Sequence, residues 1–446
     1  MITPCRSACL AFLVVLATSA ATRADDWPAW MGPQRDDVLR EDGLIEQIPD
    51  DGLPVKWRTP IAGGYAGPAV AEGRVFVFDY EREEGDVVNN PGQRAELQGR
   101  ERVTALDADT GDQLWQHSYD CPYSISYPAG PRCTPTVHDG LAYTLGSEGD
   151  LYCLRAESGE VVWQASFKDD FGADVPLWGF SGHPLVDGDL LYVLVGGDGQ
   201  NVVALNRTTG EVVWKALDGP AGYCPPSIIT AGGVRQLLVF NPEGVFGLNP
   251  ADGTQYWRVP LKPAYEMSIA RPMREGDRLY ASAIRSEAVM MQLGADEPTA
   301  EALWRGKANE AVFASNCTPL MVDGVIYGAD CNEGSLVAVD AEDGSRLWST
   351  FAATRPDETR RVNHGTCFVT RIGASDRYLL MSEVGDLLMA RLTREAFEPL
   401  GRFHALEPTG EAFGRAVVWS HPAYANRTAY IRNDKEIVAV DLAKAE

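Results

Sequence analysis

One segment repeats along most of the chain, and this repeat limits the possible folds more than any other feature of the sequence. In its clearest form the segment reads Ala-x-Asp-x-x-Thr-Gly and ends in a tryptophan four residues after the glycine. Five copies keep that glycine and end at Trp115, Trp163, Trp214, Trp257 and Trp348. Weaker copies end at Trp57, Trp304 and Phe403, so consecutive terminal aromatics are 43 to 58 residues apart. A period of this length indicates a stack or a ring of similar units.

A second marker has the same phase as the tryptophans. Six prolines stand eight residues before a phenylalanine or tyrosine, as in Pro135 with Tyr143 and Pro319 with Tyr327. Turn-forming residues such as Asp139-Gly140 lie between them, and short β-rich runs flank the turns. This pattern predicts one hairpin per unit. A third strand and a fourth that ends in tryptophan complete four short strands, which is typical of a β-propeller blade.

The two ends of the repeat region predict how many blades the ring contains. Residues 437–442 read as a third strand without a fourth, whereas residues 54–57 read as a fourth strand without predecessors. Pairing them completes an eighth blade and removes the open edge. We therefore expect an all-β, eight-bladed β-propeller with four-stranded blades, closed by the N-terminal strand pairing with the C-terminal blade. We expect residues 53–446 to form this single domain, preceded by an N-terminal extension over residues 25–52.

The first residues have the pattern of an export signal. Arg6 precedes an apolar run over residues 10–17, and small residues follow up to Ala24. This pattern predicts a secretory signal peptide over residues 1–24. No later stretch approaches the roughly 18 apolar residues of a membrane helix, so no transmembrane span is expected after it. We expect an exported protein, in the periplasm or outside the cell, with seven cysteines beyond the signal.

The charge of the chain restricts its partners. The sequence has 63 acidic and 39 basic side chains, which gives a formal net charge of −24. Such a chain repels phosphate backbones, and no basic stripe interrupts the acidic composition, so nucleic acid is not an expected partner. The expected partner is an unidentified protein, a small molecule or a sugar, while peripheral contact with a membrane stays open.

The repeats resemble those of the quinoprotein (PQQ)-like β-propeller family, and residues 27–33, Trp-Pro-Ala-Trp-Met-Gly-Pro, resemble the entry segment of its exported bacterial members. The family contains dehydrogenases that bind pyrroloquinoline quinone (PQQ) with calcium, and BamB-like scaffold lipoproteins without a cofactor. The chain lacks the adjacent cysteine pair of many of these dehydrogenases, and no residues match the family's calcium ligands. The resemblance therefore implies a non-enzymatic binding or scaffolding module. The alternative is a PQQ-dependent oxidoreductase that acts on alcohols or sugars.

The connections that enter the first strand of each unit are expected to gather around one mouth of the channel. They are rich in aromatic, histidine and arginine residues at the same structural position of different repeats. The candidate ligand-binding residues are Arg132, Trp178, His183, Tyr223, Arg271, Asn363, His364, Trp419 and His421. Aromatic walls with a few convergent polar groups are typical of a small-molecule site. In the alternative interpretation, the aromatics pack the loops together while histidine and arginine bond loop carbonyls. No motif identifies a nucleophile, so no catalytic residue is predicted.

The cysteines and one insertion leave further questions open. In several blades a cysteine stands two residues before the proline that begins the hairpin, whereas alanine, glycine or serine stands there in other blades. This pattern indicates that the position requires a small side chain. We therefore predict no metal site at these cysteines. Cys317 and Cys331 face each other across a predicted hairpin and are candidates for a disulfide. Residues 79–101 are charged and are interpreted as a solvated loop, with a partner-binding arm as the alternative.

Overall fold

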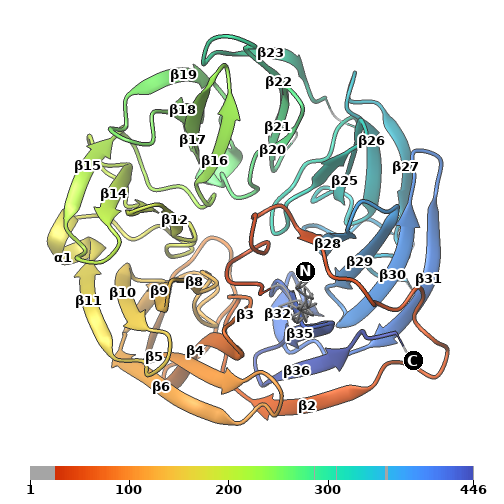
Figure 1. Cartoon of the computed structure of the whole chain (residues 1–446), viewed down its shortest axis with the longest axis horizontal. Coiled ribbons are helices and arrows are strands. Elements are labelled where there is room, and N and C mark those ends of the chain that lie inside the picture. The colour runs from red at the N-terminus through yellow and green to blue at the C-terminus, as the bar shows by residue number, and fades with distance from the viewer. Residues whose placement is uncertain (1–25, 286, 308, 357–359, 445–446) are drawn as a thin grey trace, which may run out of the picture.

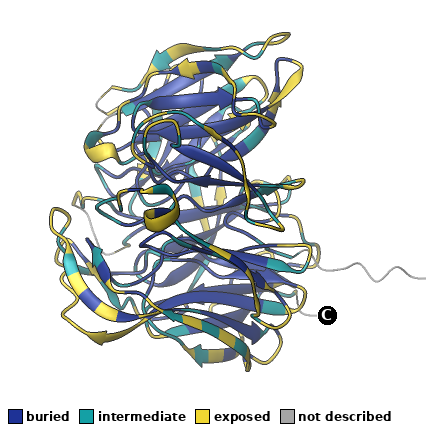
Figure 2. Cartoon of the chain, turned by 90° about the vertical axis from the view of Figure 1, so that its left-hand side faces the viewer, coloured by how far each residue is buried: buried dark blue, intermediate teal, exposed yellow. Residues whose placement is uncertain are grey.

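The computed structural model describes residues 26–285, 287–307, 309–356 and 360–444, so the predicted signal peptide lies outside the described residues. Eight antiparallel sheets stand in a ring around a central channel (Figure 1). The first strand of each blade lies innermost and the fourth lies at the rim. Figure 2 shows the ring from the side, with buried residues concentrated in the strands and exposed ones in the connections. The predicted eight-bladed β-propeller is confirmed.

The blades have the following bounds. Blade 1 contains β3 (Ala69–Ala71), β4 (Arg74–Glu84), β5 (Ala95–Asp107) and β6 (Gln113–Asp120), with β7 (Tyr123–Ile125) paired to β5. Blade 2 contains β8 (Thr136–His138), β9 (Leu141–Leu145), β10 (Asp150–Arg155) and β11 (Val161–Ser166). Blade 3 contains β12 (Leu185–Asp187), β13 (Leu190–Leu194), β14 (Val202–Asn206) and β15 (Val212–Ala216). Blade 4 contains β16 (Ser227–Ala231), β17 (Val234–Asn241), β18 (Gly244–Leu248) and β19 (Gln255–Val259).

The second half of the ring continues in the same way. Blade 5 contains β20 (Met273–Glu275), β21 (Arg278–Ala283), β22 (Glu287–Leu293) and β23 (Ala300–Arg305). Blade 6 contains β24 (Leu320–Val322), β25 (Val325–Ala329), β26 (Leu336–Asp340) and β27 (Arg346–Thr350). Blade 7 contains β28 (Cys367–Ile372), β29 (Arg377–Ser382), β30 (Asp386–Leu392) and β31 (Phe397–His404). Blade 8 contains β34 (Ala423–Ala425), β35 (Thr428–Arg432), β36 (Glu436–Asp441) and β2 (Val55–Pro60).

The ring closes through strands from the two ends of the propeller. β2 pairs with β36 in antiparallel register, with Trp57 opposite Ala439. This pairing supplies the fourth strand of blade 8 and covers the edge that β36 would otherwise expose. The closure predicted from the two incomplete fragments is therefore confirmed.

The repeated tryptophan and glycine connect neighbouring blades. The Trp115 indole N–H donates to the carbonyl of Ala156 in the next blade over 3.1 Å, and Trp163 donates in the same way to Arg207 over 3.0 Å. The hairpin glycine of the next blade lies on the indole, since a Cβ at Gly159 would approach the Trp115 ring to 2.5 Å. That glycine also has φ +73°, a region that other residues adopt at a cost. The repeated tryptophan and glycine thus form the contact between neighbouring blades.

The charged insertion in blade 1 is mostly regular hairpin. β4 and β5 continue their pairing out to Glu84 and Gln98, so the prediction of a solvated loop over residues 79–101 was wrong for most of that range. Arg102 holds the buried Asp79 through two hydrogen bonds of 2.9 Å, so the charges of this hairpin pair across its strands. The remaining loop, residues 85–94, reaches β32 (Gly410–Ala412) in the connection between blades 7 and 8, where the Asn89 amide donates to the Glu411 carbonyl over 2.7 Å.

The N-terminal extension crosses the channel. Trp27 forms a bridge with Val70 beside the innermost strand of blade 1, and β1 (Val38–Leu39) pairs in parallel with β28 of blade 7. Between them the Val137 N–H of blade 2 donates to the Pro28 carbonyl over 2.7 Å. Figure 1 shows this red segment in the middle of the ring before it runs out to β2. The extension therefore divides the channel into two ends.

Three short elements lie in the connections. They are α1 (Phe167–Phe171), the 3-10 turn η1 (Ala264–Glu266), and a two-stranded hairpin of β32 (Gly410–Ala412) and β33 (Arg415–Val417). Within the described part of the chain, no helix has the length and apolar character needed to cross a membrane.

Candidate functional site

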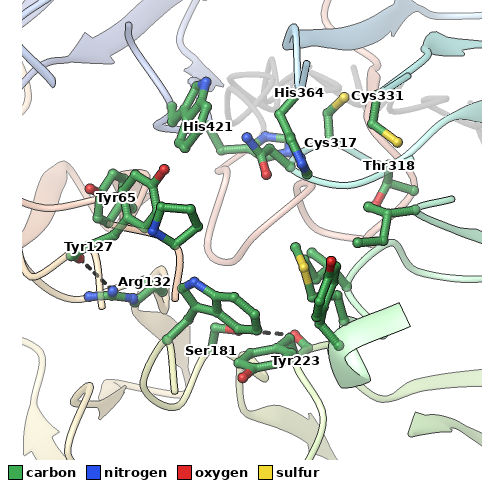
Figure 3. A pocket seen from close by; sticks show the side chains of 18 of the residues that line it. Tyr65, Tyr127, Arg132, Ser181, Tyr223, Cys317, Thr318, Cys331, His364 and His421 are labelled. Carbon is green, nitrogen blue, oxygen red and sulfur yellow. Dashed lines mark hydrogen bonds between the residues drawn. The ribbon is translucent and has the colours of Figure 1, made fainter. Parts of the chain in front are cut away.

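A cavity of about 890 Å³ lies at the end of the channel where the connections enter the innermost strands. We call it the mouth cavity (Figure 3). Eight of the nine candidate residues line it, namely Arg132, Trp178, His183, Tyr223, Asn363, His364, Trp419 and His421. They come from connections that are far apart in the sequence, as expected for a closed ring. That they lie around one cavity is a finding, whereas their role in binding stays a prediction.

Arg271 is the exception, because it faces the other end of the channel. It lines a second cavity of about 200 Å³, together with Arg35 of the N-terminal extension. Its guanidinium donates to the Arg35 carbonyl over 2.6 Å, so it anchors the extension from blade 5. The placement of Arg271 at the mouth was wrong because no repeat pattern reveals that the extension occupies the channel.

Trp30 of the extension forms part of the floor of the mouth cavity. Its ring stacks on His183 with centroids 4.9 Å apart and planes 13° apart. It also meets His421 edge-on at 5.7 Å. Sequence reasoning missed this residue, although the Trp-rich segment at residues 27–33 was the available signal.

Aromatic rings supply much of the remaining wall. The aromatic residues that line the cavity are Trp30, Tyr65, Tyr127, Trp178, Tyr223, Tyr265, Phe368, Phe413 and Trp419. Several contact one another across connections, as Trp178 and Tyr223 do edge-on at 5.8 Å. Phe413, at the tip of the β32–β33 hairpin, stacks on His364 with centroids 5.0 Å apart and planes 3° apart. The wall therefore presents flat apolar faces from several blades.

Some polar groups of the cavity already hold the loops together. Arg132 donates to the carbonyls of Ser126 and Tyr127 over 2.9 and 2.6 Å, and its guanidinium lies over the Tyr65 ring. His183 Nδ1 accepts from the Thr134 N–H over 2.8 Å. The interpretation that arginine and histidine fix the loops thus describes these two residues. It leaves other lining groups without a structural partner.

Three lining residues have buried polar atoms without a hydrogen-bond partner among the described residues. They are both ring nitrogens of His421, the Tyr127 hydroxyl and the Thr134 hydroxyl. These side chains are enclosed, with exposed fractions of 8% for His421 and 7% for Tyr127. A buried polar group left unpaired costs about 1–3 kcal/mol, so the fold alone does not account for them.

The electrostatics of the cavity keep its histidines neutral. Burial lowers the pKa of His421 to about 3, and burial followed by the Arg415 charge lowers the pKa of His364 to about 4. Burial, followed by the Arg35 charge, holds the pKa of His183 well below its usual range. At neutral pH none of the three is an acid, and an imidazole with so low a pKa is a weak base. None of the three histidines described in the cavity wall is therefore poised near neutrality for proton transfer.

Carboxylates are scarce in the mouth cavity. Glu266 is the one carboxylate among its described lining residues, and it is exposed. The buried Glu383 stands behind the wall, where it accepts from Arg415 over 2.9 Å and from the Trp419 indole over 3.4 Å. No group of three or more histidine, cysteine or acidic residues within the described ranges is arranged to hold a metal ion.

These residues do not fit the calcium and PQQ of the dehydrogenases that the repeats resemble. Calcium takes six to eight oxygen ligands, commonly with several carboxylates. The quinone itself carries three carboxylates. Of the two arginines among the described lining residues, Arg132 is engaged with loop carbonyls and Arg285 lies exposed over the Tyr265 ring. The candidate disulfide is not formed either, since Cys317 and Cys331 are both free thiols, although both line the cavity.

Comparison with known proteins agrees with the repeat architecture. A family model described as "Outer membrane protein assembly factor BamB" matches residues 99–297 and 292–446. The chain belongs to this PQQ-like repeat family. BamB from Yersinia pestis is 28% identical over 231 residues, which cover 48% of this chain and 55% of that protein. The chain thus spans about half the length of this relative.

Both branches of the PQQ-like family occur among the similar proteins. Quinoprotein ethanol dehydrogenase from Pseudomonas aeruginosa is 27% identical over 224 residues, which cover 45% of this chain and 34% of that protein. The crystal structure of BamB from Moraxella catarrhalis aligns with a TM-score of 0.52 at 14% identity, covering 87% of this chain and 99% of that one. This structural likeness supports the fold alone.

Proposed function

We propose that the chain is an exported, non-enzymatic binding module whose ligand or partner is held at the mouth cavity. The observation that carries this proposal is the cavity of about 890 Å³, with aromatic walls and buried unpartnered groups at His421 and Tyr127. Its size is typical of a ligand pocket. The similarity to BamB, whose name describes an outer-membrane assembly factor, supports a scaffold in the cell envelope.

The same geometry argues against turnover at this site. The histidines that line the cavity are neutral, and Glu266 is the one described carboxylate on its wall. His364 Nδ1 lies 3.0 Å from the Ser315 hydroxyl, but with its pKa lowered to about 4 by burial His364 is a weak base for activating a nucleophile. The described lining residues do not assemble a set of calcium ligands. Binding without chemistry is therefore the function that the residues support best.

The test compares binding with oxidation. The purified protein is mixed with PQQ and calcium, and quinone binding is followed together with dye reduction by alcohols and sugars. We expect no tight quinone binding and no dye reduction above that of a heat-denatured sample. Saturable quinone binding with turnover that His421→Phe abolishes would replace the binding module with a quinoprotein oxidoreductase.

A further inference from the structure

The unpartnered groups of the mouth cavity share a chemical property that limits the ligand. A neutral imidazole has one N–H donor and one nitrogen acceptor, and the hydroxyls of Tyr127 and Thr134 each donate and accept. The best complement to such a group is another that both donates and accepts, as an alcohol hydroxyl does. A carboxylate or phosphate offers acceptors alone, and an ammonium group offers donors alone. The hydrogen-bonding set therefore favours a ligand with several hydroxyls.

The charge distribution also favours an uncharged ligand. Arg132 spends its donors on loop carbonyls, and the exposed Arg285 bonds the Tyr265 hydroxyl. The exposed Glu266 is the one described acidic residue on the wall. Among the described lining residues, the charges that no opposite charge neutralises at the solvent side are those of the exposed Arg285 and Glu266. Because an ion pair with a solvent-exposed group contributes only about 0–1 kcal/mol, these two residues would offset little of the hydration that a charged ligand loses in the cavity.

The aromatic walls define the shape of the ligand. A sugar ring presents hydroxyls around its edge and C–H groups on its faces, and those faces pack well on flat aromatic rings. Trp30, held parallel to His183 at 4.9 Å, supplies such a surface at the floor. Phe413, held on His364 at 5.0 Å, supplies another on the wall. Because the extension crosses the channel behind Trp30, the cavity accepts a short ligand or a chain end and does not pass a polymer through.

Resting on the proposed function, we propose that the mouth cavity binds an uncharged saccharide, with a sugar ring on Trp30 and hydroxyls hydrogen-bonded by His421 and Tyr127. The aromatic faces contribute apolar contact, and the bound hydroxyls satisfy atoms that the folded chain leaves unpaired. A partner protein that inserts a side chain into the cavity is the competing occupant.

The experiment uses an array of neutral and acidic glycans, followed by tryptophan fluorescence titration of each neutral glycan bound. His421→Phe and Tyr127→Phe remove the proposed hydrogen bonds at nearly constant size. His138→Phe is the matched control, because His138 is exposed at the opposite end of the channel. We expect saturable binding of neutral glycans, weakened at least tenfold by each mouth variant and less than twofold by the control. Cooperative urea unfolding, with midpoints at or above that of the wild type at pH 7, shows that the variants fold.

Binding of acidic glycans alone, binding of none, or equal affinities in all variants would overturn the saccharide proposal. Two parallel measurements separate this failure from failure of the proposed function. If a photo-reactive probe at position 413 crosslinks a partner protein, the proposed binding module is retained and the saccharide proposal is rejected. Quinone binding with dye reduction would reject both the saccharide proposal and the non-enzymatic binding module.

Discussion

The two ends of the channel are built differently, although the same innermost strands connect them. At the opposite end the strands turn back tightly, as at Asp139 and Gly140, and the cavity there is about 200 Å³. At the mouth, long connections such as residues 121–135 and 167–184 surround about 890 Å³. Both ends keep buried polar atoms without a partner among the described residues, at Ser227 and Arg271 in the smaller cavity and at His421, Tyr127 and Thr134 in the mouth cavity. The ends therefore differ in the length of their connections and in cavity size. The mouth, with its larger cavity, is the end that the proposed function assigns to binding, and the tight turns of the opposite end are assigned to folding alone.

The largest expected effect is at the residue between the two ends. Trp30→Ala removes a buried indole that contacts His183 and His421, and a cavity of this kind costs about 3–5 kcal/mol in the free energy of unfolding. We expect ligand binding to be lost as well, because the floor is gone. Urea unfolding and glycan titration measure the two effects. A variant that keeps both properties would show that the extension does not support the mouth.

The pH dependence of His421 gives the next largest effect. Burial lowers the pKa of His421 to about 3 in the folded state, so below about pH 6.5 the unfolded chain binds a proton that the folded chain does not. Wild-type stability should therefore fall relative to His421→Phe by about 1.4 kcal/mol per pH unit as the pH drops. Urea unfolding of both proteins at pH 7 and pH 5 measures a difference of about 2 kcal/mol. A constant difference would mean that His421 is solvated or hydrogen-bonded in the folded protein.

A substitution at the opposite end should change stability without changing binding. Gly140 has φ +72°, and a Cβ there would meet no atom within 4 Å, so the cost of Gly140→Ala is that of the left-handed backbone alone. We expect a loss of about 1–2 kcal/mol in the free energy of unfolding. Glycan affinity should stay within twofold of the wild type. Weakened binding at equal folding would show that the two ends are coupled.

The smallest change in stability, with a clear change in binding, is expected at Tyr127. Tyr127→Phe deletes a buried hydroxyl without a described partner, so the free energy of unfolding should stay equal or rise by up to about 1 kcal/mol. Glycan affinity should fall at least tenfold. Differential scanning calorimetry with titration measures both quantities. A clear loss of stability would indicate that the hydroxyl serves the fold.

The repeats were sufficient to predict the blades because each tryptophan and glycine acts in the same contact. Trp115 and Gly159, for example, lie against each other at the boundary between two blades. Ring closure was also predictable, since the fragment at Trp57 needed the partner that β36 supplies. Converging connections followed from the ring, and eight of the nine candidate residues line the mouth cavity.

The structural features that the sequence did not predict are ones that do not recur in the repeats. The extension occurs once in the sequence, so no repeat pattern could predict that it lies in the channel. For the same reason, the sequence did not predict that Trp30 forms the floor of the mouth cavity or that Arg271 contacts the extension. The charged hairpin of blade 1 was misread because charges in sequence resemble a solvated loop. In the structure Arg102 and Asp79 pair across neighbouring strands. Hydrogen-bond satisfaction depends on packing, so the unpaired atoms of His421 were also beyond sequence reasoning.

Amide hydrogen exchange, measured with and without a glycan that the protein binds, tests the contrast between the two ends most directly. The account predicts slower exchange in the connections of the mouth, at residues 123–134, 178–183 and 413–421. It predicts no change in the turns at residues 138–141 and 187–190. Protection of those turns, with the mouth connections unchanged, would contradict the account.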